Sequence, residues 1–134
     1  MARVVLAGSL AVSAGLALTS CVTYSEALNR GQRHFQANEY EQALAIWRSL
    51  ERDVDSLAPG DRSRYAYFRG MTDYRMSLRD DARHWLAMAR AYDQAVPGGL
   101  EDAWRERMKD ALKDLEGDAR GDGPVARAPD AGTD

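Results

Sequence analysis

Residues 27–50 of the chain read ALNRGQRHFQANEYEQALAIWRSL, and residues 66–89 read AYFRGMTDYRMSLRDDARHWLAMA. When the second stretch is placed under the first, 39 positions later, residues of similar size meet where helices would pack. Small residues recur in both stretches: Gly31 with Gly70, and Ala43 with Ala82. Large residues do the same: Phe35 with Tyr74, and Trp47 with Leu86. The sequence therefore predicts an internal repeat.

The apolar residues of both stretches recur at helical spacing, and the same spacing continues to residue 116. No alternation typical of strands appears between residues 23 and 116. Breaks between helices are expected at Asn38-Glu39, Pro59-Gly60 and Pro97-Gly98-Gly99, because these residue types favour turns. The sequence thus predicts an all-α fold of five helices, with Asp61 as the N-cap of the third. The last helix, from Leu100, has a charged outer face that suits the end of a stack.

The spacing of four residues in the first stretch resembles a tetratricopeptide repeat: Gly31, Tyr40, Ala43 and Trp47. In that family a glycine on the first helix of a hairpin faces an alanine on the second, and an aromatic residue follows the alanine. The resemblance implies a short stack of two helical hairpins, about residues 24–54 and 62–93, closed by a C-terminal capping helix.

The chain also departs from that family. Leu50 stands where the family usually has alanine, and Arg79 stands where an aromatic residue is usual. The spacing of 39 residues exceeds the family's period of about 34, and we expect a longer loop at residues 53–60 to absorb the difference. A generic helical bundle with a chance echo of Gly and Ala is the alternative.

Residues 1–20 have the features of a secretory signal: one charge, Arg3, then an apolar run and small residues. The segment leads into Leu18-Thr19-Ser20-Cys21, which resembles the lipobox of bacterial lipoproteins. The resemblance implies cleavage before Cys21, a diacylglycerol on its sulfur and, in many bacteria, an acyl chain on the new amino terminus. The alternative is an ordinary secretory signal beside an unrelated cysteine. That cysteine would have no disulfide partner within the chain, which contains one cysteine.

The expected organisation is a lipoprotein signal peptide at 1–20, a helical domain at 21–116 and a disordered tail at 117–134. The tail consists mostly of Gly, Asp, Ala and Pro, so it has too little apolar surface to offset chain entropy. Two or three acyl chains would hold the protein on a membrane without a spanning helix. Val22 stands where lipoproteins of the inner membrane often carry Asp. The resemblance therefore implies the outer membrane, on the periplasmic side of the cell envelope.

A capping box is expected directly after the cysteine. Thr23 and Glu26 have the spacing at which each side chain satisfies a backbone amide near the other residue. This pattern predicts that the first helix begins at Thr23, with Val22 as the only link to the lipid.

Composition and motifs argue against several functions. The formal net charge is −3, so the chain has no basic surface of the kind that binds nucleic acid. No zinc motif, phosphate loop or nucleophile elbow appears. We therefore expect no enzyme activity, no metal site and no cofactor except the covalent lipid on Cys21. The alternative is a small envelope enzyme or metal-binding protein that uses His34 or His84.

Surface is the remaining candidate for function. If the hairpins stack as in the resembled family, the first helix of each lines a concave groove. Aromatic residues, Met and Arg are enriched at protein interfaces. The residues expected to bind a partner are Leu28, Gln32, Phe35, Tyr67, Met71, Tyr74 and Arg75. The alternative is that Phe35, Tyr67 and Met71 belong to the core. Leu28 and Gln32 replace the Lys and Asn by which family members bind a terminal carboxylate, so that activity is not carried over.

Two hairpins and a capping helix are fewer than the three or so repeats that a solenoid usually needs. Another protein is therefore expected to complete the stack. The leading hypothesis is a non-enzymatic scaffold or assembly factor, anchored in the outer membrane, whose partners are unidentified proteins of the cell envelope. A purely structural lipoprotein that spaces the layers of the envelope is a further hypothesis. The sequence names neither the partner nor the oligomeric state.

Overall fold

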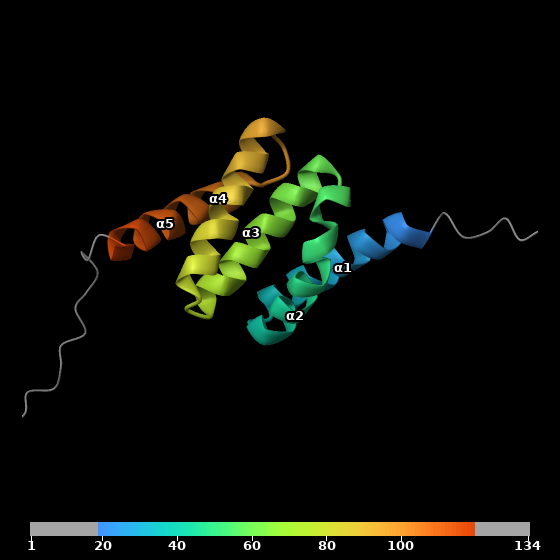
Figure 1. The fold of residues 1–134 in the computed structure, drawn as a ribbon, viewed down its shortest axis with the longest axis horizontal. Coiled ribbons are helices and arrows are strands. Elements are labelled where there is room, and N and C mark those ends of the chain that lie inside the picture. Colours follow the sequence, from blue (N-terminus) through green and yellow to red (C-terminus); the bar gives the residue numbers. More distant parts are fainter. Residues whose placement is uncertain (1–18, 120–134) are drawn as a thin grey trace, which may run out of the picture.

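The computed structural model describes residues 19–119, and these residues are helical apart from short connections (Figure 1). The elements follow one another as α1 Thr19–Gln36, α2 Tyr40–Leu50, the 3-10 helix η1 Glu51–Ser56, α3 Pro59–Arg75, α4 Arg79–Ala95 and α5 Asp102–Ala119. No strand occurs within residues 19–119. The prediction of an all-α fold with five α-helices in this region is confirmed.

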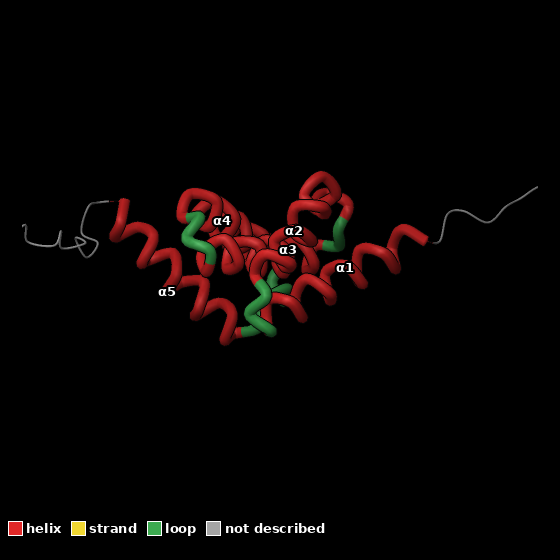
Figure 2. The backbone as a smooth tube through the Cα atoms, turned by 90° about the horizontal axis from the view of Figure 1, so that it is seen from below, coloured by secondary structure: helices red, strands yellow, loops and turns green. Residues whose placement is uncertain are grey.

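The helices form two hairpins and a terminal helix. α1 packs on α2, α3 packs on α4, and α3 also contacts α1, α2 and α5. Figure 2 shows α1 and α5 running outward in opposite directions from the middle of the molecule, where α3 lies between them. Because α3 touches every other α-helix, it is the central element of the fold.

The turns of the two hairpins have the same backbone conformation. Asn38 and Ser77, which are 39 positions apart, both have φ of 61° and so lie in the left-handed region. In the first turn the amide of Glu39 donates to the carbonyl of His34 at 2.9 Å. In the second, the amide of Leu78 donates to the carbonyl of Asp73, also at 2.9 Å. The internal repeat predicted from side chains is therefore also present in the backbone.

Each hairpin closes on a glycine. A Cβ atom built on Gly31 would lie 2.7 Å from Cζ2 of Trp47, and one built on Gly70 would lie 2.7 Å from Cγ of Leu86. Real Cβ atoms do not approach other atoms so closely. The two glycines are thus required because the large side chain of the facing helix occupies the space that their own side chain would need.

The core continues through both hairpins into α5. Its largest fully buried side chains include Trp47, Tyr65 and Tyr67, and Leu115 of α5 is also fully buried. Ala43 and Ala82 are buried completely as well, where the repeat pattern places small residues between helices. The terminal helix therefore belongs to the same core as the hairpins.

Two boundaries differ from the prediction. Pro59 begins α3, and Asp61 lies within the helix and is not its N-cap. Proline suits this first position because its missing amide hydrogen would have no partner there. Residues 53–56, which were expected to belong to a loop at 53–60, lie instead in the 3-10 helix η1, which buries Val54.

The ends of the described region also extend beyond the expected limits. α1 begins at Thr19, so the helix start expected at Thr23 is wrong and Thr23 lies inside the helix. α5 continues through residues 117–119, which were assigned to the tail. The rest of the expected signal peptide and tail lies outside the described residues.

The glycine contact gives a direct test of the fold. The substitution Gly70→Ala would place a methyl group against Leu86, including its backbone nitrogen at 2.9 Å, so the helices must separate. We expect a loss of about 1–3 kcal/mol in the free energy of unfolding, measured by urea denaturation.

The matched control is Gly117→Ala, because a Cβ there meets nothing within 4 Å and the residue is helical. This variant should gain up to about 1 kcal/mol from helix propensity. Equal stability of the Gly70→Ala variant and the parent chain would contradict the packing argument.

Candidate interaction site

The residues expected to bind a partner divide into two groups by burial. Leu28, Tyr67 and Met71 are buried, at 1%, 1% and 5% exposure. Tyr67 and Met71 are therefore core residues, as the alternative expected, and Leu28 is a core residue that was expected only at the groove. Phe35 is partly buried against the core. Accessible surface remains on Gln32 and Phe35 of α1 and on Tyr74 and Arg75 of α3.

Aromatic rings fill the space between α1, α3 and α5. Phe68 of α3 lies edge-on to Phe35 of α1 at 5.3 Å between centroids, and edge-on to Trp104 of α5 at 4.9 Å. Trp104 also stacks on Tyr67 at 5.5 Å. Because α5 covers Tyr67, the middle of the expected groove is closed by side-chain packing.

A hollow remains at the beginning of α3, beside this aromatic cluster. Its volume is about 380 Å³, within the range of ligand pockets. It is lined by Gln32 of α1, Arg64 of α3, residues 98–101 and Trp104 of α5. One expected partner-binding residue, Gln32, therefore lies in a hollow formed by both hairpins and the terminal helix. Arg64 and Trp104 were missed as site residues, although Arg64 lies three positions before Tyr67 and so shares its side of the helix.

The guanidinium group of Arg64 is held by amide oxygens from α1. Its Nε donates to Oε1 of Gln32 at 2.9 Å, and one terminal nitrogen donates to Oδ1 of Asn29 at 2.6 Å. The nearest carboxylate is that of Asp61, 4.0 Å away, which is outside hydrogen-bonding distance. Arg64 is thus oriented by amide oxygens, and its ion pair with Asp61 is long.

At the other end of α3, Tyr74 takes part in a contact with α5. Its hydroxyl donates to Asp114 at 2.9 Å, and Arg79 of α4 donates to the same carboxylate oxygen at 2.9 Å. Hydrogen bonds from Arg79 and Tyr74 lower the pKa of Asp114. Arg79, which departs from the aromatic residue usual in the resembled family, therefore helps to attach the terminal helix.

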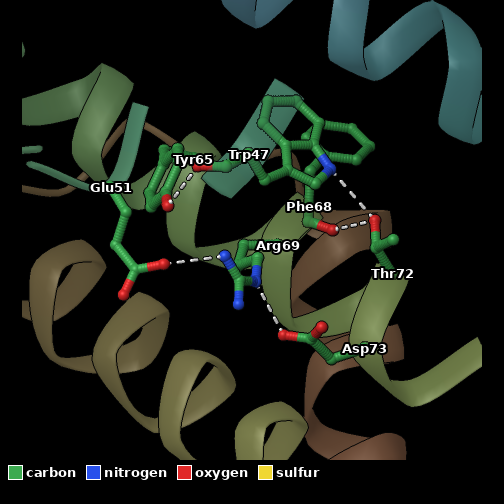
Figure 3. A network of polar contacts seen from close by, with 7 residues as sticks. All are labelled: Trp47, Glu51, Tyr65, Phe68, Arg69, Thr72 and Asp73. Carbon is green, nitrogen blue, oxygen red and sulfur yellow. Dashed lines mark hydrogen bonds and ion pairs between the residues drawn. The ribbon is translucent and has the colours of Figure 1, made fainter. Parts of the chain in front are cut away.

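A buried polar network connects the two hairpins (Figure 3). Nε1 of Trp47 donates to the hydroxyl of Thr72 at 3.0 Å, and that hydroxyl donates to the carbonyl of Phe68 at 2.6 Å. The hydroxyl of Tyr65 donates to the carbonyl of Trp47 at 2.9 Å. These bonds fix the position of α2 on α3 because each buried donor would otherwise lose its partner.

An ion pair lies in the same region of α3. Nε of Arg69 is 2.8 Å from Oδ2 of Asp73, and these residues are 4% and 0% exposed. Arg69 also donates to the half-exposed Glu51 at 3.0 Å (Figure 3). Its guanidinium group lies over the ring of Trp85, 5.5 Å from the centroid. Burial raises the pKa of Asp73, and the hydrogen bond from Arg69 opposes that change. Because the pair is internal to the fold, we assign it a structural role.

The two histidines lie on different helices and have separate neighbours. Nδ1 of His34 is 2.6 Å from Oε2 of Glu39, in the turn after α1. The exposed His84 of α4 is edge-on to Trp85 at 5.1 Å. Within residues 19–119, no cluster of three or more His, Cys, Asp or Glu side chains is arranged to hold a metal ion.

Comparisons with known proteins find no matching family model, no matching curated protein and no matching solved structure. In the part of the chain that the structure describes, no helix combines the length and apolarity needed to cross a membrane.

The ion pair in α3 supplies the second prediction. The substitution Arg69→Met leaves the fully buried Asp73 without its main partner, because the second oxygen of Asp73 has no hydrogen bond within residues 19–119. We expect a loss of about 3–5 kcal/mol, typical of a buried charge deprived of its partner. Thermal and urea unfolding measure it.

The double variant Arg69→Met, Asp73→Leu should recover much of this loss, because an apolar pair of similar volume often replaces a buried ion pair without cost. A double variant no more stable than the single one would show that Asp73 does not need Arg69 as its counter-charge.

Proposed function

We propose that this chain is an outer-membrane-anchored lipoprotein whose helical domain is a non-enzymatic protein–protein interaction scaffold or assembly factor in the cell envelope. The observation that carries the proposal is the hollow beside Arg64, because residues from both hairpins and the terminal helix meet there. A polar hollow with a positioned arginine and an aromatic wall has the residue types that dominate binding energy at interfaces.

The geometry of the hairpins supports a relationship to tetratricopeptide repeats. Gly31 packs on Trp47 and Gly70 on Leu86 at corresponding positions, and both turns have a residue in the left-handed region at the corresponding position. We infer that the chain uses this architecture as such repeats do, by presenting the side formed by the first helix of each hairpin. The arrangement around His34 and His84 provides no observation in favour of an enzyme or a metal-binding protein.

The proposed anchor is a lipid on Cys21, supported by the lipobox-like segment. α1 contains Cys21 and continues without a break to Gln36. The helical domain therefore lies close to the proposed attachment point. In the proposed mature protein, which starts at Cys21, the scaffold would act within one small domain's reach of the outer membrane, on its periplasmic side.

Replacement of the lipidated residue tests the anchor. The variant Cys21→Ala should lose incorporation of labelled palmitate and move from the membrane fraction to the aqueous fraction, because two or three acyl chains supply the membrane affinity. A density gradient of the parent protein then tests the membrane. Cofractionation with inner-membrane markers would contradict the outer-membrane assignment, and membrane association of the unlabelled variant would contradict the lipid anchor.

A photocrosslinker placed in cells tests the scaffold. At Arg75, which is exposed on α3, it should capture a defined envelope protein, whereas at Glu41, which is exposed on α2, it should not. Mass spectrometry of the crosslinked bands identifies the partner. The same capture pattern at both positions, or none at either, would count against an interaction surface on the α3 side.

A further inference from the structure

Arg64 differs from Arg69 and Arg105 in what holds it, and like Arg62 it is bonded to uncharged oxygens. Arg69 is paired with Asp73, and Arg105 is paired with Asp93 at 2.7 Å and Asp102 at 2.6 Å. Arg64 has amide oxygens as its hydrogen-bond acceptors, and its side chain is 22% exposed. Amide acceptors orient a guanidinium group but do not neutralise it, so this arginine can still bind a carboxylate with little loss of side-chain freedom.

The remaining walls of the hollow fit a peptide segment. Gly98 has no side chain and open space where a Cβ would stand, which allows a backbone to approach. Trp104 contributes a half-buried aromatic wall. Glu101 is the acidic residue in the lining, and Asp61 lies 4.0 Å from Arg64 on its own helix. Both carboxylates repel anions, so the hollow accommodates an acidic group only where that group contacts Arg64 directly.

Two further arginines lie farther along the same side. The hydroxyl of Tyr67 has the guanidinium groups of Arg107 and Arg75 as its cationic neighbours, and both arginines are exposed. Arg64 and Arg75 are separated by roughly 16 Å along α3, from the helical rise of about 1.5 Å per residue. An extended segment of about five residues spans that distance. Positive charges at both ends of such a path suit a ligand with several acidic side chains, not one terminal carboxylate.

Building on the proposed scaffold function, we propose that this surface binds an extended acidic segment of a protein partner, with one aspartate or glutamate side chain in the hollow on Arg64. Further carboxylates of the segment lie near Arg107 and Arg75. Trp104 and Gln32 border the contact with Arg64.

The test uses the full mature chain in non-ionic detergent and a synthetic peptide of alternating aspartate and alanine, acetylated and amidated at its ends. Binding is followed by calorimetry and by the indole N–H resonances of the parent protein. The resonance of Trp104 should shift during titration, whereas that of Trp47, which is buried and bonded to Thr72, should not. The asparagine version of the peptide should bind at least about tenfold more weakly, as expected when a charge-assisted contact is lost.

Charge removal provides the matched variants. Arg64→Gln should weaken binding of the aspartate peptide by about tenfold or more, whereas Arg48→Gln on the exposed side of α2 should leave it within about twofold. Circular dichroism establishes that both variants retain their helices. If Arg64→Gln fails to fold, the shift of the Trp104 resonance in the parent protein tests the proposed site without this variant.

The inference is overturned if the aspartate peptide does not bind, if its asparagine version binds equally well, or if Trp104 does not respond. It is also overturned if a neutral peptide with a free carboxyl terminus binds in preference, since that would identify a terminal carboxylate as the ligand. Capture of a partner at Arg75 in cells, together with any of these results, would leave the scaffold function standing and remove the acidic segment alone.

Discussion

The fold depends on the contact between a glycine and a large side chain within each hairpin. Gly31 accepts the indole of Trp47, and Gly70 accepts the side chain of Leu86. Because these glycines lack a Cβ, the helices approach closely enough to bury Ala43 and Ala82 completely. α3 packs on α4 through this contact and also contacts α1, α2 and α5. The same narrow packing leaves one face of α3 for α1 and α5 to cover.

Polar groups add specificity to a core that apolar packing would leave less defined. The indole of Trp47 donates to Thr72, and the hydroxyl of Tyr65 donates to the carbonyl of Trp47. A slip of one helix along another would leave these buried donors without acceptors, which costs more than the bonds themselves contribute. Arg69 contributes through its contact with Glu51 of η1, which such a slip would break. The network therefore selects one register among packings of comparable apolar area.

Much of the fold was predictable because helical spacing and the recurrence of Gly31 at Gly70 can be recognised in the sequence. The start of α3 was missed because Pro59 was interpreted as a break, whereas a proline is also well suited to a first helical turn. The 3-10 helix was missed because its residues carry mixed turn and helix signals and its stabilising contact, the burial of Val54, is tertiary. For the site, the sequence indicated Gln32 and residues of α3, but it did not indicate which of the expected residues are buried. Whether Tyr67 faces a partner or Trp104 depends on where α5 lies, which helical periodicity does not specify.

The short turns after α1 and α3 have a consequence for how the chain folds. Each hairpin closes through a turn whose bonds join residues five positions apart, such as Glu39 with His34 and Leu78 with Asp73. Proteins dominated by such local contacts fold quickly, because little loop-closure entropy is lost before the first contacts form. The bond from Trp47 to Thr72, across 25 positions, joins the two hairpins. The turns thus favour early closure of each hairpin as the chain emerges, and the buried bond between Trp47 and Thr72 forms only when the two hairpins meet in the correct register.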